Sequence, residues 1–217
     1  NKSLKMKKTV TLFLLLSVTL GCRAQVLDTY TTLSWQTPPN AYLKDIQNFQ
    51  NQFVGTWVYQ NGLETLEVRL VKKEMMVINP GPNQYYEDVL VGEYSYVDTM
   101  GVVRVNSLSN LLLNPNNKFS YHLFSGAKLA LDRYPACPNC PIGTERLYLH
   151  FDEPANDDMG LAAGFVIRRV IENGVEKLKV QYYNVSTAFG RKKGDFTQPS
   201  TFTNFSLPYG EYTLLKL

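Results

Sequence analysis

The sequence predicts an all-β protein built as a single antiparallel up-and-down barrel of about eight to ten strands, with a short helix before the first strand. Three observations predict this class. Apolar and polar residues alternate in several stretches after residue 53, which is the pattern of half-buried strands. Turn residues separate those stretches, and no long helical pattern interrupts them. A closed barrel is favoured over a sandwich because closure removes exposed strand edges.

The first expected element is a leader over residues 1–21, with Met6 as the expected translation start. Lys7 and Lys8 precede an apolar run over residues 10–20. That run is shorter than the roughly 20 residues needed to cross a bilayer. A basic start followed by a short apolar core is typical of a secretory signal.

Two cleavage sites compete after this run. Gly21-Cys22 resembles the lipobox of bacterial lipoproteins, in which the cysteine thiol receives a diacylglycerol and becomes the first residue. An ordinary signal cut after Ala24 is the alternative. With lipid attachment at Cys22, residues 22–44 are expected to form the lipidated N-terminus and a tether, and the membrane becomes a partner.

The domain is expected over residues 45–217, and it begins with a short helix. Ile46, Phe49 and Phe53 have the spacing of one helical face. Asn173-Gly174 lies between two apolar runs and predicts a tight hairpin. The expected strands lie within residues 54–61, 63–71, 85–97, 101–108, 118–124, 145–153, 164–172, 175–184 and 210–217.

Gly55-Thr56-Trp57, directly after the expected helix, resembles the G-x-W opening of lipocalin-type barrels. The resemblance implies that Trp57 plugs the closed end of a lipocalin-like (calycin-like) barrel and that Gly55 lets the helix approach the strand. Lipocalins often stack an arginine on this tryptophan. Here only Lys216 is available near the C-terminus for that role.

The whole chain resembles an uncharacterised family of flavobacterial lipoproteins. The resemblance rests on segments that occur in the same order, namely GCRAQ, FVGTWVYQNG, YYEDVLVGEYSY, NSLSNL, a Cys-x-x-Cys followed by ERLYLHFDEP, and PYGEYTLLKL. It implies a lipid-anchored protein in the cell envelope of a Gram-negative bacterium, with the outer membrane as the expected location. It implies no activity.

Charge argues against a nucleic-acid partner. The full chain carries 22 basic and 19 acidic residues. The leader holds four of the lysines and no acid, so 18 basic and 19 acidic residues remain from Cys22 onward. No basic surface for nucleic acid is expected from this balance. With 44% hydrophobic and 12% aromatic residues, the domain can bury a substantial core.

Cys137 and Cys140 admit four interpretations: a disulfide, a redox site, a zinc site or two free thiols. In an oxidising envelope the pair is read first as a disulfide that closes a proline-rich loop. A redox site would need a lowered thiolate pKa, and no helix follows to supply it. A zinc site would have to recruit His122 and His150, the two histidines of the chain, without helical spacing between ligands. We expect no metal and no cofactor.

Catalytic signatures are lacking in the sequence. Acidic residues cluster over residues 152–158 and suggest either a calcium loop or a solvated turn, but the EF-hand spacing is missing. No G-x-S-x-G elbow or phosphate-binding loop is found. Glu87 and Asp88 are adjacent, so in a strand their side chains point to opposite faces. We expect no catalytic residues and no enzymatic activity.

Tyrosines recur on the expected strands, and those singled out as candidate ligand-binding residues are Tyr94, Tyr96, Tyr121 and Tyr182. Facing inward, their rings and hydroxyls would line a pocket for a small amphipathic molecule; they would otherwise fill the core or form a partner surface. The predicted function is a non-enzymatic, lipid-anchored module for a small apolar or amphipathic ligand. The alternative is a structural protein with a filled barrel that binds an envelope protein.

Overall fold

The structure, a computed structural model, describes residues 25–217. The expected leader and the expected lipid attachment site at Cys22 lie outside the described residues. Among residues 25–217, no helix combines the length and the apolar character required to span a bilayer.

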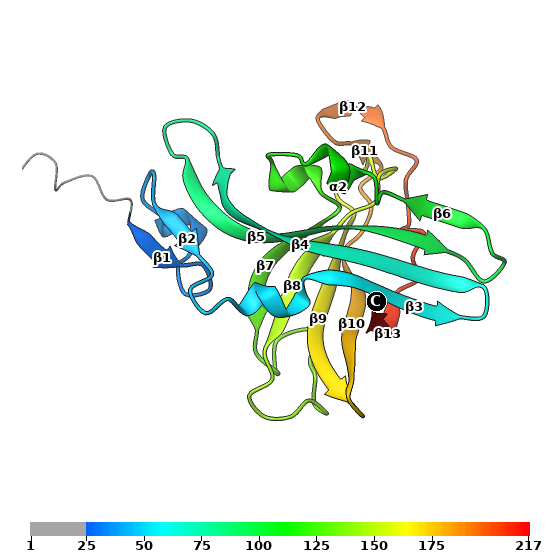
Figure 1. Ribbon diagram of the computed structural model, residues 1–217. Coiled ribbons are helices and arrows are strands. Elements are labelled where there is room, and N and C mark those ends of the chain that lie inside the picture. Colours follow the sequence, from blue (N-terminus) through cyan, green and yellow to red (C-terminus); the bar gives the residue numbers. More distant parts are fainter. Residues whose placement is uncertain (1–24) are drawn as a thin grey trace, which may run out of the picture.

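Eight antiparallel strands form a closed barrel, as the sequence predicts (Figure 1). Around the barrel the order is β5, β4, β3, β13, β10, β9, β8 and β7. The barrel closes where β7 pairs with β5, at Val91↔Phe124 and Gly92↔Leu123. The strands are β3 (Gly55–Asn61), β4 (Glu64–Ile78), β5 (Tyr85–Val97), β7 (Leu123–Leu129), β8 (Arg146–Phe151), β9 (Ala162–Glu172), β10 (Val175–Ser186) and β13 (Gly210–Lys216).

The remaining helices and strands are shorter and are not part of the barrel wall. The helical ones are the 3-10 helices η1 (Ser34–Gln36), η2 (Phe49–Phe53) and η3 (Lys118–Ser120), and one short α-helix, α2 (Asn110–Leu113). The remaining strands are β1 (Val26–Asp28), β2 (Tyr42–Lys44), β6 (Val103–Asn106), β11 (Arg191–Lys192) and β12 (Asp195–Pro199).

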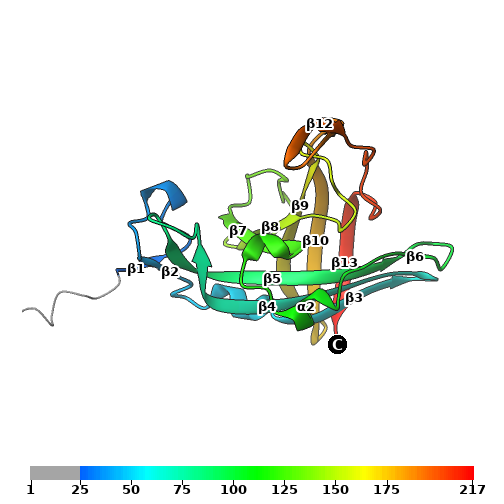
Figure 2. The same ribbon diagram turned by 90° about the horizontal axis from the view of Figure 1, so that it is seen from above.

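The segment before the barrel extends the sheet. β1 pairs in parallel with β2, and β2 pairs in parallel with the first residues of β5. Both strands lie beyond one end of the barrel, beside the start of β5 (Figures 1 and 2). The described part of the segment that was expected to be a tether, residues 22–44, therefore contains two strands.

The expected helix before the first barrel strand is the 3-10 helix η2, and it is shorter than the apolar spacing suggested. Phe49 and Phe53 are buried, whereas Ile46 is 53% exposed because it precedes the helix. The hairpin at Asn173-Gly174 is confirmed: the two residues join β9 to β10 with φ angles of 54° and 78°. Positive φ at both positions is what a type I′ turn requires.

Alternating side chains from the barrel strands fill the barrel interior. Trp57, Tyr94, Phe165 and Tyr182 are among the largest fully buried side chains. Phe151 lies between several of these rings, with its centroid 4.6 Å from that of Tyr182 and 4.7 Å from that of Tyr94. The interior is therefore a packed aromatic core.

Trp57 lies where η2 meets the barrel. Its indole Nε1 donates a hydrogen bond to the carbonyl oxygen of Phe53, at 2.8 Å. The ammonium of Lys216 lies 5.4 Å from the centroid of the Trp57 ring and also pairs with Glu176 at 2.8 Å. The last strand thus places a cation over this tryptophan, within the range of a cation–π contact.

Candidate functional site

The four candidate tyrosines do not surround one cavity. Tyr94, Tyr96 and Tyr182 belong to the core inside the barrel. Tyr121 belongs to a separate cluster with Val89 and Val91, whose side chains leave the opposite face of β5. The structure therefore brings three of the four together and places them within packed core.

The hydroxyls of these tyrosines differ in their partners. Tyr96 donates to Glu64 Oε1 at 2.9 Å, and burial together with this contact raises the pKa of Tyr96 to about 12. Tyr121 donates to the carbonyl oxygen of Pro115 at 2.9 Å. Among the described residues, the buried hydroxyls of Tyr94 and Tyr182 have no hydrogen-bond partner, and burial raises the pKa of both.

A groove of about 770 Å³ lies on the outside of the barrel. We call it the outer groove. Its walls are the loop after β1, the start of β5, η3, and the outer faces of β7 and β8. The rings that line it belong to Tyr30, Trp35, Tyr85, Phe119, Phe124 and His150. Its size falls within the range of small-molecule sites.

The β7–β8 wall of the outer groove is a ladder of rings. Phe124 is paired with His150 across the two strands, and their rings stack at 4.6 Å and 16°. Phe119 meets the edge of Phe124 at 5.3 Å. Next to them Gly126 lets the Tyr148 ring pack against the backbone, because a Cβ there would lie 2.8 Å from Cδ1 of Tyr148. This wall offers a flat apolar surface.

Burial lowers the pKa of His150 from its ordinary value of 6.5, and the nearby charge of Lys118 lowers it further. The cations at the groove are paired: Lys118 contacts Glu87 Oε2 at 2.6 Å and Lys128 contacts Glu145 Oε1 at 2.9 Å. Apolar rings and paired charges together suit an amphipathic molecule.

Lys128 also ties the groove to the helix η2. Its ammonium lies 4.0 Å from the centroid of the Phe49 ring and 4.9 Å from that of Tyr30. A cation between two aromatic rings is attracted to both faces. The aliphatic carbons of Lys128 therefore form part of the groove wall, and its ammonium lies at the edge of the groove.

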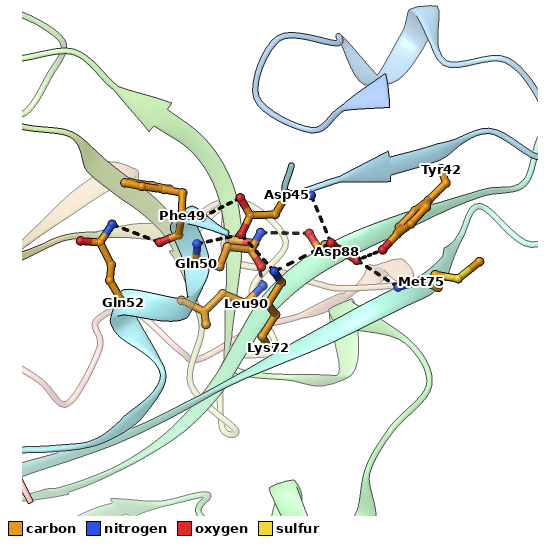
Figure 3. A network of polar contacts seen from close by, with 10 residues as sticks. Tyr42, Asp45, Phe49, Gln50, Gln52, Lys72, Met75, Asp88 and Leu90 are labelled. Carbon is orange, nitrogen blue, oxygen red and sulfur yellow. Dashed lines mark hydrogen bonds and ion pairs between the residues drawn. The ribbon is translucent and has the colours of Figure 1, made fainter. Parts of the chain in front are cut away.

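A buried polar network holds the N-terminal wall of the outer groove in place (Figure 3). Asp88, on β5, is fully buried. Its carboxylate accepts hydrogen bonds from the hydroxyl of Tyr42, the backbone N–H of Asp45 at 3.1 Å and that of Met75 at 3.2 Å. One carboxylate therefore links β2 and β4 to β5.

Asp45 continues this network toward η2. Its carboxylate accepts the backbone N–H groups of Phe49 and Gln50, both at 2.8 Å, and so caps the helix. Lys72 Nζ lies 3.1 Å from Asp45 Oδ2 and 3.9 Å from Asp88 Oδ2. Two buried carboxylates share one ammonium, and their remaining acceptors are occupied by N–H and O–H donors (Figure 3). The partners come from β2, β4, β5, η2 and the residue directly after β2, so the network anchors the wall to the barrel.

The expected orientation of Glu87 and Asp88 is confirmed. Glu87 reaches Lys118 at the outer groove, whereas Asp88 reaches the buried network. No sequence pattern indicated that Asp45, Lys72 and Asp88 meet. Lys72 and Asp88 approach each other through the antiparallel pairing of β4 with β5, and Asp45, directly after β2, joins them because β2 pairs with β5.

The acidic segment 152–158 anchors loops. Asp158 accepts backbone N–H groups from Phe189 at 2.9 Å, Gly160 at 2.8 Å, Leu161 at 3.0 Å and Gly190 at 2.6 Å. Burial acts to raise its pKa, and these four donors together lower it to about 2. Glu153 accepts two bonds from Ser206, both at 2.7 Å. Across residues 25–217, no group of three or more His, Cys, Asp or Glu side chains is arranged to hold a metal ion.

Cys137 and Cys140 form a disulfide, with their Cα atoms 5.4 Å apart. This confirms the disulfide among the four interpretations of the pair. The two histidines have other partners: His122 Nδ1 lies 2.6 Å from Glu93 Oε2, and His150 stacks on Phe124. The loop closed by the disulfide covers the buried Arg146 on β8, whose guanidinium donates to the carbonyl oxygens of Ala130, Arg133 and Pro135.

The outer groove was not found by sequence reasoning. Phe124 and His150 meet through the register between β7 and β8, and Tyr30 joins them because β1 and β2 continue the sheet. Outward-facing aromatic residues on two expected strands were the available signal. They do not reveal which strands are neighbours.

The chain was compared with protein families, with curated proteins and with solved structures. Residues 6–217 match a family of unknown function, DUF6705. Neither a curated protein nor a solved structure matches the chain significantly. Because the match spans nearly the entire sequence, the chain belongs to the DUF6705 family.

Proposed function

We propose that this protein is a non-enzymatic binding module of the cell envelope of a Gram-negative bacterium. A lipid on Cys22 anchors it, with the outer membrane as the expected location, and a small apolar or amphipathic molecule binds in the outer groove. The observation that carries the proposal is the groove itself, in which stacked rings on β7 and β8 face Tyr30 and Trp35.

Because the barrel interior is packed, we place the ligand on the outside of the barrel. The interior rings contact one another and are buried, so a ligand inside the barrel would have to displace core side chains. In the outer groove the rings are already accessible: Trp35 is 77% exposed and Phe119 is 62% exposed. Covering such rings with a ligand removes apolar surface from water, which is favourable by about 25 cal/mol per Å².

Ligand binding is tested by titrating the purified protein with N-phenyl-1-naphthylamine, an apolar fluorescent probe. We expect saturable binding that Phe119→Ser weakens about tenfold, because burying one aromatic side chain contributes about 1.5 kcal/mol or more. Phe196→Ser is the matched control, since Phe196 is 63% exposed on β12 and does not line the groove. Non-saturable binding, or equal loss in both variants, would refute the groove as the site.

The anchor is tested separately. We expect mass spectrometry of the protein from its native membrane to show a diacylglyceryl group on Cys22, and Cys22→Ser to move the protein into the soluble envelope fraction. A free thiol at Cys22, or its removal with the leader, would refute the anchor and leave the groove proposal standing.

The filled barrel favours a second candidate function, an interaction protein that binds an envelope protein through its outer surface. A photo-crosslinking residue at position 35, at the groove, is compared in cells with one at position 196. A single stoichiometric adduct from position 35 alone, in a protein that binds no small probe, would favour this function over the first.

A further inference from the structure

A second cavity, of about 330 Å³, lies on a different wall of the barrel from the outer groove. We call it the basic pocket. One side is the disulfide loop, residues 136–139, and the other is the outer face of β8, β9, β10 and β13. Its charged lining residues are Arg146, Arg168, Lys179 and Glu211, so cations outnumber acids by three to one.

Arg146 is the buried cation of this pocket. It is 1% exposed. Its Nη atoms donate to the backbone carbonyls of Ala130, Arg133 and Pro135, in the segment before the disulfide loop, and to Gln181 Oε1 at 3.0 Å, all of them neutral acceptors. Within the described chain no carboxylate lies at ion-pair distance from Arg146, and its Nε has no hydrogen-bond partner. A buried charge without a counter-charge is unusual, because such groups are normally paired.

None of the other charged residues of the basic pocket neutralises the charge of Arg146. Arg168 is half-buried on β9 and forms no ion pair among residues 25–217. Lys179 contacts Glu172 at 3.4 Å. Glu211, the single acid of the lining, lies within 3.4 Å of the amide of Gln181. Burial lowers the pKa of Arg146, and Asp132 acts on it only from beyond ion-pair distance.

We propose that the basic pocket binds a small oxyanion, such as a phosphate or carboxylate group, between Arg146, Arg168 and the disulfide loop. Guanidinium N–H groups donate charge-assisted hydrogen bonds to oxyanions, and Nε–H is the one donor of Arg146 without a partner among the described residues. The volume is at the lower end of small-ligand sites. The disulfide holds the loop that forms the second wall, so the site is complete only with the loop closed.

Binding is tested by calorimetric titration of the purified protein with inorganic phosphate at constant ionic strength. We expect saturable binding that Arg168→Gln weakens about tenfold, since a hydrogen bond to a charged group contributes about 1.5 kcal/mol or more. Arg169→Gln is the matched control, because Arg169 is the next residue on β9, pairs with Glu176 at 2.5 Å and lies outside the pocket. No saturable binding, or equal weakening in both variants, overturns the proposal.

A second measurement tests whether the anion contacts Arg146. The Arg146 Nε–H resonance, assigned with Arg146→Lys, is expected to shift saturably with phosphate and to remain unchanged with chloride at equal ionic strength. Vesicles of phosphatidylglycerol in phosphatidylcholine then distinguish a lipid headgroup from a free anion. Vesicle binding that Arg168→Gln abolishes assigns the oxyanion to a lipid, and its absence assigns it to a soluble molecule. An Nε–H resonance that phosphate leaves unchanged overturns the site.

Discussion

The barrel interior and the outer groove are both lined by aromatic side chains, and they differ in what those side chains leave uncovered. Inside, Phe151 contacts the rings of Tyr94, Tyr182 and Phe205, at centroid distances of 4.7, 4.6 and 5.5 Å. Outside, Phe119 meets the single ring of Phe124 and keeps 62% of its surface exposed. The interior rings are therefore covered by one another, whereas the groove rings keep exposed apolar surface.

The largest expected effect concerns the interior. Phe165 is fully buried against Phe151 and Tyr182, so Phe165→Ala is expected to lower the free energy of unfolding by about 4 kcal/mol through lost burial and a cavity. Chemical denaturation measures it. Phe196→Ala, on the exposed surface of β12, should change it by less than about 0.5 kcal/mol. Similar losses in both variants would mean that the interior is not tightly packed.

The second prediction addresses the network behind the groove wall. Asp88→Ala removes the acceptor of Tyr42, Asp45 N–H and Met75 N–H and leaves Lys72 with Asp45 alone. Because buried donors lose their partners, we expect the free energy of unfolding to fall by about 3 kcal/mol.

Hydrogen exchange shows where this loss acts. Amides of β2 and η2 should exchange faster in Asp88→Ala, while those of β9 and β10 keep their protection. The control is Glu87→Gln, the adjacent carboxylate that faces Lys118 outside the core. Faster exchange across the whole barrel would show that the network supports the fold as a unit and not the groove wall alone.

Period-two alternation predicted an all-β fold with one buried face on each strand, and the cost of exposed strand edges favoured a closed barrel over a sandwich. Leu66 and Val68 on β4 and Leu147 and Leu149 on β8 are buried in the expected sense. Asn173-Gly174 fixed a hairpin through local backbone preference alone. Those features depend on residues that are close in sequence.

The groove and the network could not be predicted in this way, because they depend on contacts between distant residues. Tyr42 and Asp88 are 46 residues apart, and no periodicity in residues 25–44 indicated that β2 would pair with β5. The tyrosines illustrate the same limit. Strand alternation placed Tyr94 and Tyr96 on one face, but it does not state whether that face encloses a cavity or a packed core.

The third prediction concerns acid. Asp158 has a pKa of about 2 in the folded protein, below the value of about 3.9 for an unfolded chain. Its ionised form therefore stabilises the fold above about pH 4, and this contribution is lost as the pH falls toward 2. The amides of Phe189 and Gly190 donate to it, so we expect their protection from hydrogen exchange, taken relative to the intrinsic rate at each pH, to fall first in acid.

Asp158→Asn is expected to remove this dependence and to show faster exchange of the same amides already at pH 7. Asp157→Asn is the control, because Asp157 is adjacent but its side chain is 43% exposed, beside Lys192. Protection at Phe189 and Gly190 that falls with pH equally in the original protein and in Asp158→Asn would assign the acid response to another carboxylate.

The last prediction concerns the two tryptophans, one in the barrel interior and one at the outer groove. It has the smallest expected effect on stability, and it compares the two regions directly. Trp57 is fully buried in the core, and Trp35 is 77% exposed at the outer groove. Trp35→Phe should change the free energy of unfolding by less than about 0.5 kcal/mol and should remove the emission that acrylamide quenches, leaving the blue-shifted emission of Trp57. An apolar ligand in the groove should then protect Trp35 from acrylamide in the original protein and leave Trp57 unaffected. A ligand-induced change in the blue-shifted emission of Trp57, with Trp35 still quenched by acrylamide, would place the ligand inside the barrel and reverse the roles that the packing assigns to the two regions.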